Sequence, residues 1–256
     1  MKNLSLLIFL LLISSNNLIA QSGFITEETT VASFKMGSME SSTHSYFSEN
    51  SYYSKMDFSF QGKGIARLMS RDIENGTVIS FEDSTIVKIN YKKNRFTRQS
   101  FSEFLAEKNS SEEDQSENQS ENQSENQSEN EESDENDQDP IVSDTLEMIN
   151  GFESYKITLD DSENKQFIWV TAKEEQSDIV KNMKEKIAEF ERNWGSIDIN
   201  FSELGMNENA ILVKAVFTDE DGSFEYNLKK YALINAIPEM FNMPKDYKKV
   251  KKLKMF

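Results

Sequence analysis

His44 is the only histidine in the 256-residue chain, and it lies in a run of hydroxyl side chains that comprises Ser41, Ser42, Thr43 and Ser45. A serine hydrolase needs such a pair, but it also needs an orienting acid and an oxyanion hole. The chain has no nucleophile-elbow motif to supply the strained turn that exposes a catalytic serine. We therefore expect a polar loop over residues 37–50, with His44 solvated and not acting as a base.

Metal chemistry is equally poorly supported by the sequence. There is no cysteine, and one imidazole cannot build a transition-metal site without several carboxylates. The run Asp219-Glu220-Asp221-Gly222 is similar to the start of a calcium loop, but the later acid is not at EF-hand spacing and the flanks are strand-like. We predict a hairpin turn there, and a non-enzymatic protein with no cofactor and no metal.

A strongly acidic segment divides the chain, from Ser110 to Asp139. It contains four tandem Gln-Ser-Glu-Asn repeats, thirteen acidic residues, no basic residue and no apolar side chain. Such a composition cannot bury enough surface to offset its ordering entropy, so we predict disorder. It accounts for most of the formal net charge of −17, since its removal leaves 32 acidic against 28 basic residues. A nearly balanced remainder argues against a nucleic-acid partner.

The first twenty residues are typical of a secretory signal peptide. Lys2 precedes an apolar core from Leu4 to Ile13, and Ala20 suits the last position before cleavage. No later apolar run approaches the twenty residues of a transmembrane helix, so we expect no transmembrane segment. We predict an exported protein, periplasmic or secreted, with residues 21–256 forming one domain that the acidic segment, residues 110–139, interrupts.

Short strands joined by tight turns dominate the rest. Alternation is clearest from Tyr52 to Phe60, and we predict further strands over residues 24–35, 65–69, 77–81, 85–91, 95–101, 141–149, 155–159, 166–172, 210–218 and 224–234. The turn signals are Asn75-Gly76, Glu82-Asp83-Ser84, Lys92-Lys93-Asn94, Asn150-Gly151 and Asp221-Gly222. The basic segment from Lys245 to Lys254 favours a solvated edge strand.

One helix is clearly indicated. Apolar residues recur every three or four positions after Ser177, at Ile179, Met183, Ile187, Phe190 and Trp194. We therefore predict a mainly β fold of the α+β type: a curved antiparallel sheet, or unclosed β-barrel, covered by one long amphipathic helix. Residues 101–107 could form a second, shorter helix capped by Ser100 or Ser102.

Several segments resemble a family of exported bacterial proteins of unknown function. They are residues 53–58, 84–87, 92–97, 149–156, 167–171 and 243–250, including Tyr53-Ser54-Lys55-Met56-Asp57-Phe58 and Phe167-Ile168-Trp169-Val170-Thr171. The resemblance implies a fold like that of the lipoprotein carriers LolA and LolB, in which an unclosed antiparallel barrel holds acyl chains. No residue of this chain matches a diagnostic carrier residue, so only the architecture is carried over.

The resemblance leads us to expect a lipid, acyl chain or other amphiphile as partner, bound in a half-barrel cavity. The candidate lining residues are the apolar strand positions Met56, Phe58, Phe60, Trp169, Val213 and Phe217. Periodicity alone does not distinguish a lined cavity from a dry core. The alternative is an envelope interaction or structural protein with a dry core, whose acidic segment contacts ions or a protein partner that the sequence does not identify.

Replacing residues 110–139 by a short Gly-Ser loop tests the single-domain prediction. Loop closure entropy changes slowly with length, by roughly 2 kcal/mol over three doublings, so the shortened protein should fold. We expect one cooperative thermal unfolding transition, recorded by circular dichroism and calorimetry. Two independent transitions would show that the segment links two domains.

Overall fold

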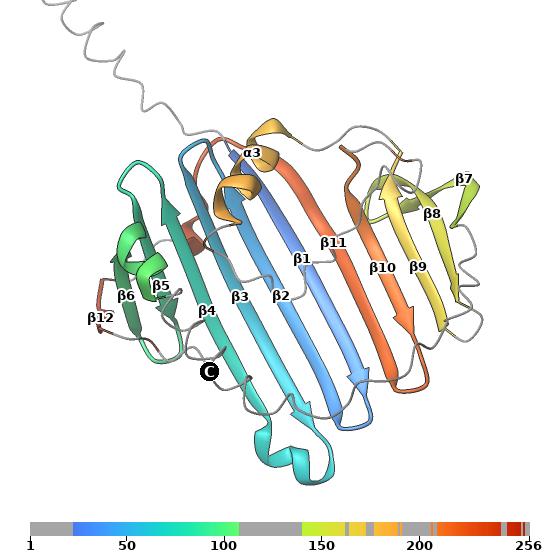
Figure 1. The fold of residues 1–256 in the computed structure, drawn as a ribbon, viewed down its shortest axis with the longest axis horizontal. Coiled ribbons are helices and arrows are strands. Elements are labelled where there is room, and N and C mark those ends of the chain that lie inside the picture. The colour runs from blue at the N-terminus through green and yellow to red at the C-terminus, as the bar shows by residue number, and fades with distance from the viewer. Residues whose placement is uncertain are drawn as a thin grey trace, which may run out of the picture.

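The computed structural model describes residues 23–107, 140–161, 164–172, 177–188, 190, 206, 209–241, 245–251 and 253. The predicted signal peptide and the acidic segment lie outside these residues. Twelve strands of the described residues form one open sheet in the order β12-β6-β5-β4-β3-β2-β1-β11-β10-β9-β8-β7 (Figure 1). The mainly β prediction is therefore confirmed, with neighbouring strands antiparallel except for the parallel pair β6 and β12.

The strands before the acidic segment are β1 (Gly23–Phe34), β2 (Gly37–Phe47), β3 (Ser51–Gly62), β4 (Arg71–Ser80), β5 (Thr85–Asn90) and β6 (Arg95–Ser100). Those after it are β7 (Ile141–Ile149), β8 (Phe152–Asp161), β9 (Asn164–Thr171), β10 (Leu212–Thr218), β11 (Gly222–Ile234) and β12 (Lys248–Lys249). The helical elements are the 3-10 turns η1 (Gly64–Met69) and η2 (Glu239–Phe241), the α-helix α3 (Asp178–Ile187) and a helix over residues 101–107.

The first strand pairs with the last long one. β1 and β11 run antiparallel from Gly23 opposite Ile234 to Phe34 opposite Gly222, with one irregularity after Glu27. Strands from before and after the acidic segment thus belong to one sheet. The basic C-terminal segment contributes β12 to the outer edge beside β6, as the lysine-rich edge-strand prediction requires.

Two segments differ from the predicted structure. Residues 37–47 form the central strand β2, whereas we predicted a loop there. Its many serines have weak strand propensity, but pairing with β1 on one side and β3 on the other satisfies its backbone along its whole length. Residues 65–69, predicted as a strand, instead belong to the turn η1, in which Ile65 and Leu68 are exposed.

Asn75-Gly76, predicted as a turn, lies inside β4. Gly76 pairs with Lys55 on β3 and with Ile89 on β5. A Cβ atom at Gly76 would lie 2.9 Å from ring atoms of Tyr91, so the missing side chain makes room for that ring. The glycine is therefore explained by close packing and not by a turn.

The other turn predictions are confirmed. Asn150 and Gly151 have φ values of 52° and 91° and connect β7 to β8, and Ser84 and Asn94 also occupy left-handed turn positions. In the β10–β11 hairpin, Asp219 Oδ1 accepts hydrogen bonds from the backbone N–H groups of Asp221 and Gly222, both at 2.8 Å. This carboxylate stabilises a turn, as predicted in place of a calcium loop.

The helices are short, so the single long amphipathic helix is not supported. α3 begins after Ser177, whose Oγ accepts a hydrogen bond from the Ile179 N–H, and it ends at Ile187. Trp194, the last apolar residue of the predicted helix, lies outside the described residues. The helix over residues 101–107 starts with a reciprocal cap, in which the Ser100 N–H donates to the Glu103 carboxylate and the Glu103 N–H donates to Ser100 Oγ.

The described residues form two hydrophobic clusters on the sheet. The larger joins α3 to β2, β3, β4 and β5 and contains the buried residues Phe47, Tyr52, Ile79, Ile86, Val180, Met183, Ile187 and Phe190. The smaller contains Ile157, Ile168, Val170 and Ala215, on β8, β9 and β10, together with Ala210, which precedes β10. Both lie on the face that α3 covers at one end (Figure 1), which we call the helix face.

Ile79→Ala should lower the free energy of unfolding by about 2–5 kcal/mol, because it leaves a cavity beneath α3. Ile79 is 1% exposed, whereas Ile65, the matched control, is 91% exposed. Ile65→Ala should change stability by less than about 0.5 kcal/mol. Chemical denaturation followed by circular dichroism measures both variants, and equal losses would contradict this packing.

Candidate functional site

The structure separates the six predicted lining residues. Tyr52 belongs to the cluster beneath α3 and so lies on the helix face. An even number of positions further along β3 are Met56, Phe58 and Phe60, which share that face and are half-buried, as Phe217 is. Val213 has no exposed surface and sits where the β9–β10 register shifts. Only four of the six residues thus remain on one partly accessible surface.

Trp169 lies on the opposite face, because it alternates out of phase with the helix-face residues Ile168 and Val170. Its Nε1 donates a 2.9 Å hydrogen bond to the Glu147 carboxylate. The Nζ atoms of Lys156 and Lys214 lie 5.4 and 5.3 Å from the centre of its ring. These contacts make Trp169 a structural residue on a different side of the sheet from Phe58.

The helix face carries an apolar stripe away from α3. We use this term for the half-buried residues Phe34, Met39, Phe58, Phe60, Phe217 and Phe224. The registers align Phe60 with Met39, Met39 with Ala32, Ala32 with Phe224, and Phe224 with Phe217. Ring centres of Phe34 and Phe60 lie 6.1 Å apart, and those of Phe217 and Phe224 lie 5.7 Å apart. The stripe therefore crosses five adjacent strands.

A polar band separates this stripe from the cluster under α3. The band comprises Thr26, Glu28, Thr43, Ser45 and Asn75, all on the helix face by alternation and register. Asn75 pairs with Met56, Met56 with Thr43, and Thr43 with Glu28, so the band lies on β1, β2 and β4, with Met56 of β3 between its parts. Buried polar groups in the middle of a sheet face are uncommon without partners.

Glu28 is the charged centre of the polar band. The residue keeps some accessible surface, yet its carboxyl lies deep among protein atoms. Burial raises the pKa of Glu28, while Lys184 on α3 and the Thr26 hydroxyl oppose the rise. Burial and the nearby Glu28 charge also raise the pKa of Tyr226 well above its usual value. A raised pKa makes the carboxyl a potential hydrogen-bond donor as well as an acceptor.

Two further groups in the band have unmet hydrogen-bonding capacity. Thr26 and Asn75 are each 3% exposed, and neither the Thr26 hydroxyl nor either polar atom of the Asn75 amide has a hydrogen-bond partner. The Thr26 hydroxyl lowers the pKa of Glu28 as a side-chain hydrogen-bonding group, although the two groups are not aligned as in a regular hydrogen bond. Each such group costs about 1–3 kcal/mol when left unpaired, so the band offers unused donors and acceptors to a polar ligand group.

Sequence reasoning missed the band, although a signal for Glu28 was present. Alternation along β1 puts Phe24, Thr26, Glu28, Thr30, Ala32 and Phe34 on one face, so a carboxylate lies between two threonines on a face whose ends are apolar. The Asn75-Gly76 pair is typical of a turn, so the sequence does not predict a buried strand position for Asn75. No local pattern marks it as buried, since its surroundings come from three strands.

His44 lies in β2, half-buried, and is not the solvated loop residue that we predicted. It faces away from α3, between Glu27 on β1 and Lys55 on β3 in the register, and its buried Nδ1 has no hydrogen-bond partner. Alternation directs Ser41, Thr43 and Ser45 to the helix face instead. The strand thus separates the histidine from three of the four hydroxyl groups that could suggest a hydrolase.

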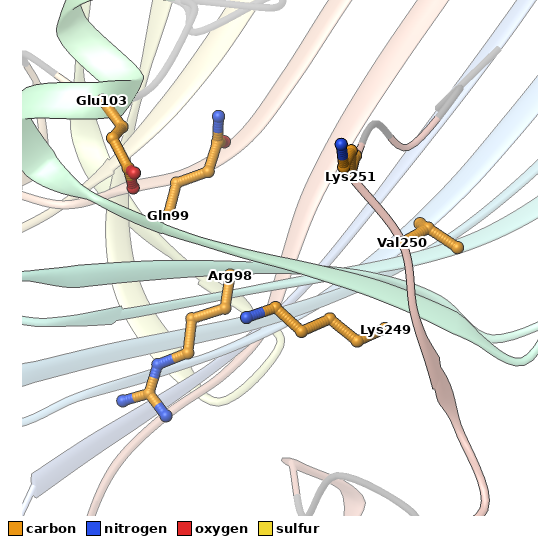
Figure 2. A pocket seen from close by; sticks show the side chains of 6 residues that line it. All are labelled: Arg98, Gln99, Glu103, Lys249, Val250 and Lys251. Atoms are coloured by element: carbon orange, nitrogen blue, oxygen red, sulfur yellow. The ribbon is translucent and has the colours of Figure 1, made fainter.

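A shallow hollow of about 560 Å³ lies at the β6–β12 edge, lined by Arg98, Gln99, Glu103, Lys249, Val250 and Lys251. Figure 2 shows Arg98 and Gln99 on opposite sides of β6, so the hollow wraps an edge of the sheet. Arg98 already lies 3.7 Å from the Asp83 carboxylate. The hollow is open and of mixed charge, and its side chains do not converge on a common point.

Among the described residues, no group of three or more His, Asp or Glu side chains is arranged to hold a metal ion. Within the same part of the chain, no helix is both long and apolar enough to cross a membrane.

Comparison with known proteins gives no matching family model and no significantly similar curated protein. Among solved structures, the chain is similar to PNGF-II in the C2 and P21 space groups, with 12% and 11% identity and TM-scores of 0.27 and 0.26. The matches cover 89% and 86% of this chain but only 30% of each PNGF-II chain. TM-scores this low support no conclusion about function. The comparisons show no relation to the LolA and LolB carriers.

Glu28→Gln should change how stability depends on pH. The folded state holds the Glu28 proton more tightly than the unfolded state, so wild-type stability should fall as pH rises from about 4.5 through the raised pKa. The variant lacks this loss and should gain stability relative to wild type between acidic and neutral pH. Urea unfolding at a series of pH values measures the difference, and parallel pH profiles would show that Glu28 is not desolvated.

Proposed function

We propose that this protein is a non-enzymatic, extracytoplasmic binding protein for a single-chain amphiphile. The apolar chain lies along the apolar stripe, and the polar head group lies at the polar band. The observation that carries the proposal is the juxtaposition of these two surfaces on one sheet face. The half-buried ring of Phe58 lies two residues along β3 from Met56, which pairs with Asn75, a buried and unpaired polar residue of the band.

The chemistry of the two surfaces favours an amphiphile over a purely apolar ligand. The stripe offers rings and a thioether, which bury chain methylenes at about 0.8 kcal/mol each. The Thr26 hydroxyl and the Asn75 amide can each donate and accept hydrogen bonds, and a protonated Glu28 can do the same. A hydroxyl or amide head group would satisfy them. The predicted export and the resemblance to the lipoprotein carriers also support this proposal.

A second candidate is an envelope interaction protein with a dry core, and the edge strand β7 favours it. β7 ends the sheet, and its apolar side chains are unusually exposed: Ile141 is 59%, Leu146 49% and Met148 65% exposed. An exposed apolar edge can take a strand from another chain. In this alternative, the stripe contributes only packing.

Binding of a fluorescent long-chain alcohol to the purified protein tests the first candidate. Wild type should bind saturably, and Phe58→Ser should weaken binding about tenfold or more by removing apolar contact in the stripe. Phe167→Ser is the matched control, because Phe167 is also half-buried but lies on the opposite face beside Trp169. The control should retain wild-type affinity.

Native mass spectrometry of the protein as purified gives an independent measurement. A co-purifying amphiphile that is depleted in Phe58→Ser supports the proposal. If wild type neither carries an amphiphile nor binds the probe saturably, the binding function is wrong. Equal probe affinity of wild type and Phe58→Ser would move the ligand away from the stripe.

A further inference from the structure

The β3–β4 connection forms a projecting tip, which we define as residues 61–71. Figure 1 shows η1 extending beyond the neighbouring hairpin ends at the end of the sheet away from α3. Ile65 and Leu68 on η1 are each 91% exposed. Met36, in the neighbouring β1–β2 turn, is 65% exposed. The Lys63 N–H donates a 2.7 Å hydrogen bond to the Met36 carbonyl, so the three apolar side chains belong to one locality.

The tip is held in shape by its own backbone. The Gly62 N–H donates to Ser70 Oγ at 2.9 Å, the Ala66 N–H to the Lys63 carbonyl at 3.1 Å, and the Ser70 N–H to the Arg67 carbonyl at 3.2 Å. A Cβ atom at Gly62 would lie 1.9 Å from the Ala66 carbonyl oxygen, so only glycine permits this close return. The exposure of Ile65 and Leu68 is therefore built into an ordered turn, and a partner meets a preformed apolar surface.

The charge of the tip is of one sign. Residues 61–71 include Lys63, Arg67 and Arg71 and no acidic residue, whereas the chain outside residues 110–139 is nearly balanced in charge. Lys63 and Arg67 are exposed beside Ile65 and Leu68. Apolar side chains flanked by basic ones match the two layers of an anionic bilayer surface, because acyl chains lie just below phosphate-bearing head groups.

We propose that the tip is a membrane-docking element that inserts Ile65 and Leu68 into the interface of an anionic lipid bilayer, with Lys63 and Arg67 contacting lipid phosphates. Its convex shape favours a bilayer over a protein partner. A stable protein interface needs an extended complementary surface, which a single projecting turn does not provide. A deformable lipid interface accepts a narrow apolar projection without a preformed pocket.

The position of the tip also relates it to the apolar stripe. Phe60 and Phe34, whose rings stack, lie two residues from Gly62 and Met36 respectively. Docking at the tip would bring this end of the stripe to the lipid surface, where an amphiphile could pass between bilayer and sheet. This link rests on the proposed binding function, whereas membrane docking itself does not.

Co-sedimentation with vesicles tests the docking. Wild-type protein should bind vesicles of phosphatidylglycerol and phosphatidylcholine, and should bind pure phosphatidylcholine vesicles more weakly. The double variant Ile65→Ser/Leu68→Ser should lower the partition coefficient about tenfold or more. The matched control Ile141→Ser/Leu146→Ser removes exposed apolar side chains from β7, at the far edge of the sheet, and should bind as wild type does.

The basic residues have a separate signature. Lys63→Gln/Arg67→Gln should lower binding to the anionic vesicles, reduce its dependence on salt, and leave weak binding to phosphatidylcholine unchanged. Circular dichroism should show all variants folded, because the replaced side chains are exposed. The docking proposal is overturned if wild type fails to bind anionic vesicles, or if the Ile65→Ser/Leu68→Ser variant and the β7 control bind equally well.

The same variants separate docking from amphiphile binding. Ile65→Ser/Leu68→Ser should keep wild-type affinity for the soluble fluorescent alcohol while losing vesicle binding. Phe58→Ser should lose probe affinity and keep vesicle binding. Vesicle binding without any saturable probe binding would leave docking standing and overturn only the proposed function.

Discussion

The antiparallel ladder between β1 and β11 holds the described sheet together. Along it, residues about two hundred positions apart in sequence meet, as Gly23 meets Ile234 and Phe34 meets Gly222. In the open strand order, this ladder is the junction between β2–β6 on one side and β7–β10 on the other. Forming it requires closure of a very long loop, whose entropic cost grows only slowly with loop length. Insertion of a long acidic segment between β6 and β7 is therefore compatible with this sheet.

The features on which the function is proposed meet at the same ladder. Glu28 lies opposite Leu228, and Ala32 lies opposite Phe224, so the polar band reaches this ladder on β1 and the apolar stripe crosses it from β2 through β1 to β11. Packing under α3 supports the face at one end, and the tip marks the other. Between them, the sheet retains unpaired polar atoms and partly exposed rings. Such groups reduce stability, and a bound amphiphile would offset that cost by hydrogen bonding and burial.

Two Asn-Gly pairs in this chain show how far local reasoning extends. Asn150-Gly151 forms the turn that its side chains favour, with both residues at positive φ. Asn75-Gly76 remains extended because β3 and β5 pair with it on both sides and the Tyr91 ring packs over Gly76. The same limit affects residues 37–47, whose many hydroxyl groups suggested a loop. Two neighbouring strands supply enough backbone pairing to override that preference.

The amino-acid sequence by itself determined the β-rich class, most strands, the turns at Asn150-Gly151 and Asp219–Gly222, and the cap at Ser177, and it left the cap of residues 101–107 to Ser100 or Ser102. These depend on side-chain periodicity and on local hydrogen bonds, which span only a few residues. Only the tertiary structure decided which residues share a face of the sheet. It placed Trp169 on the other face from Phe58, Glu28 on the same face as the apolar stripe, and Leu68 on an exposed tip. Alternation establishes that a strand has two faces, but long-range pairing decides what each face meets.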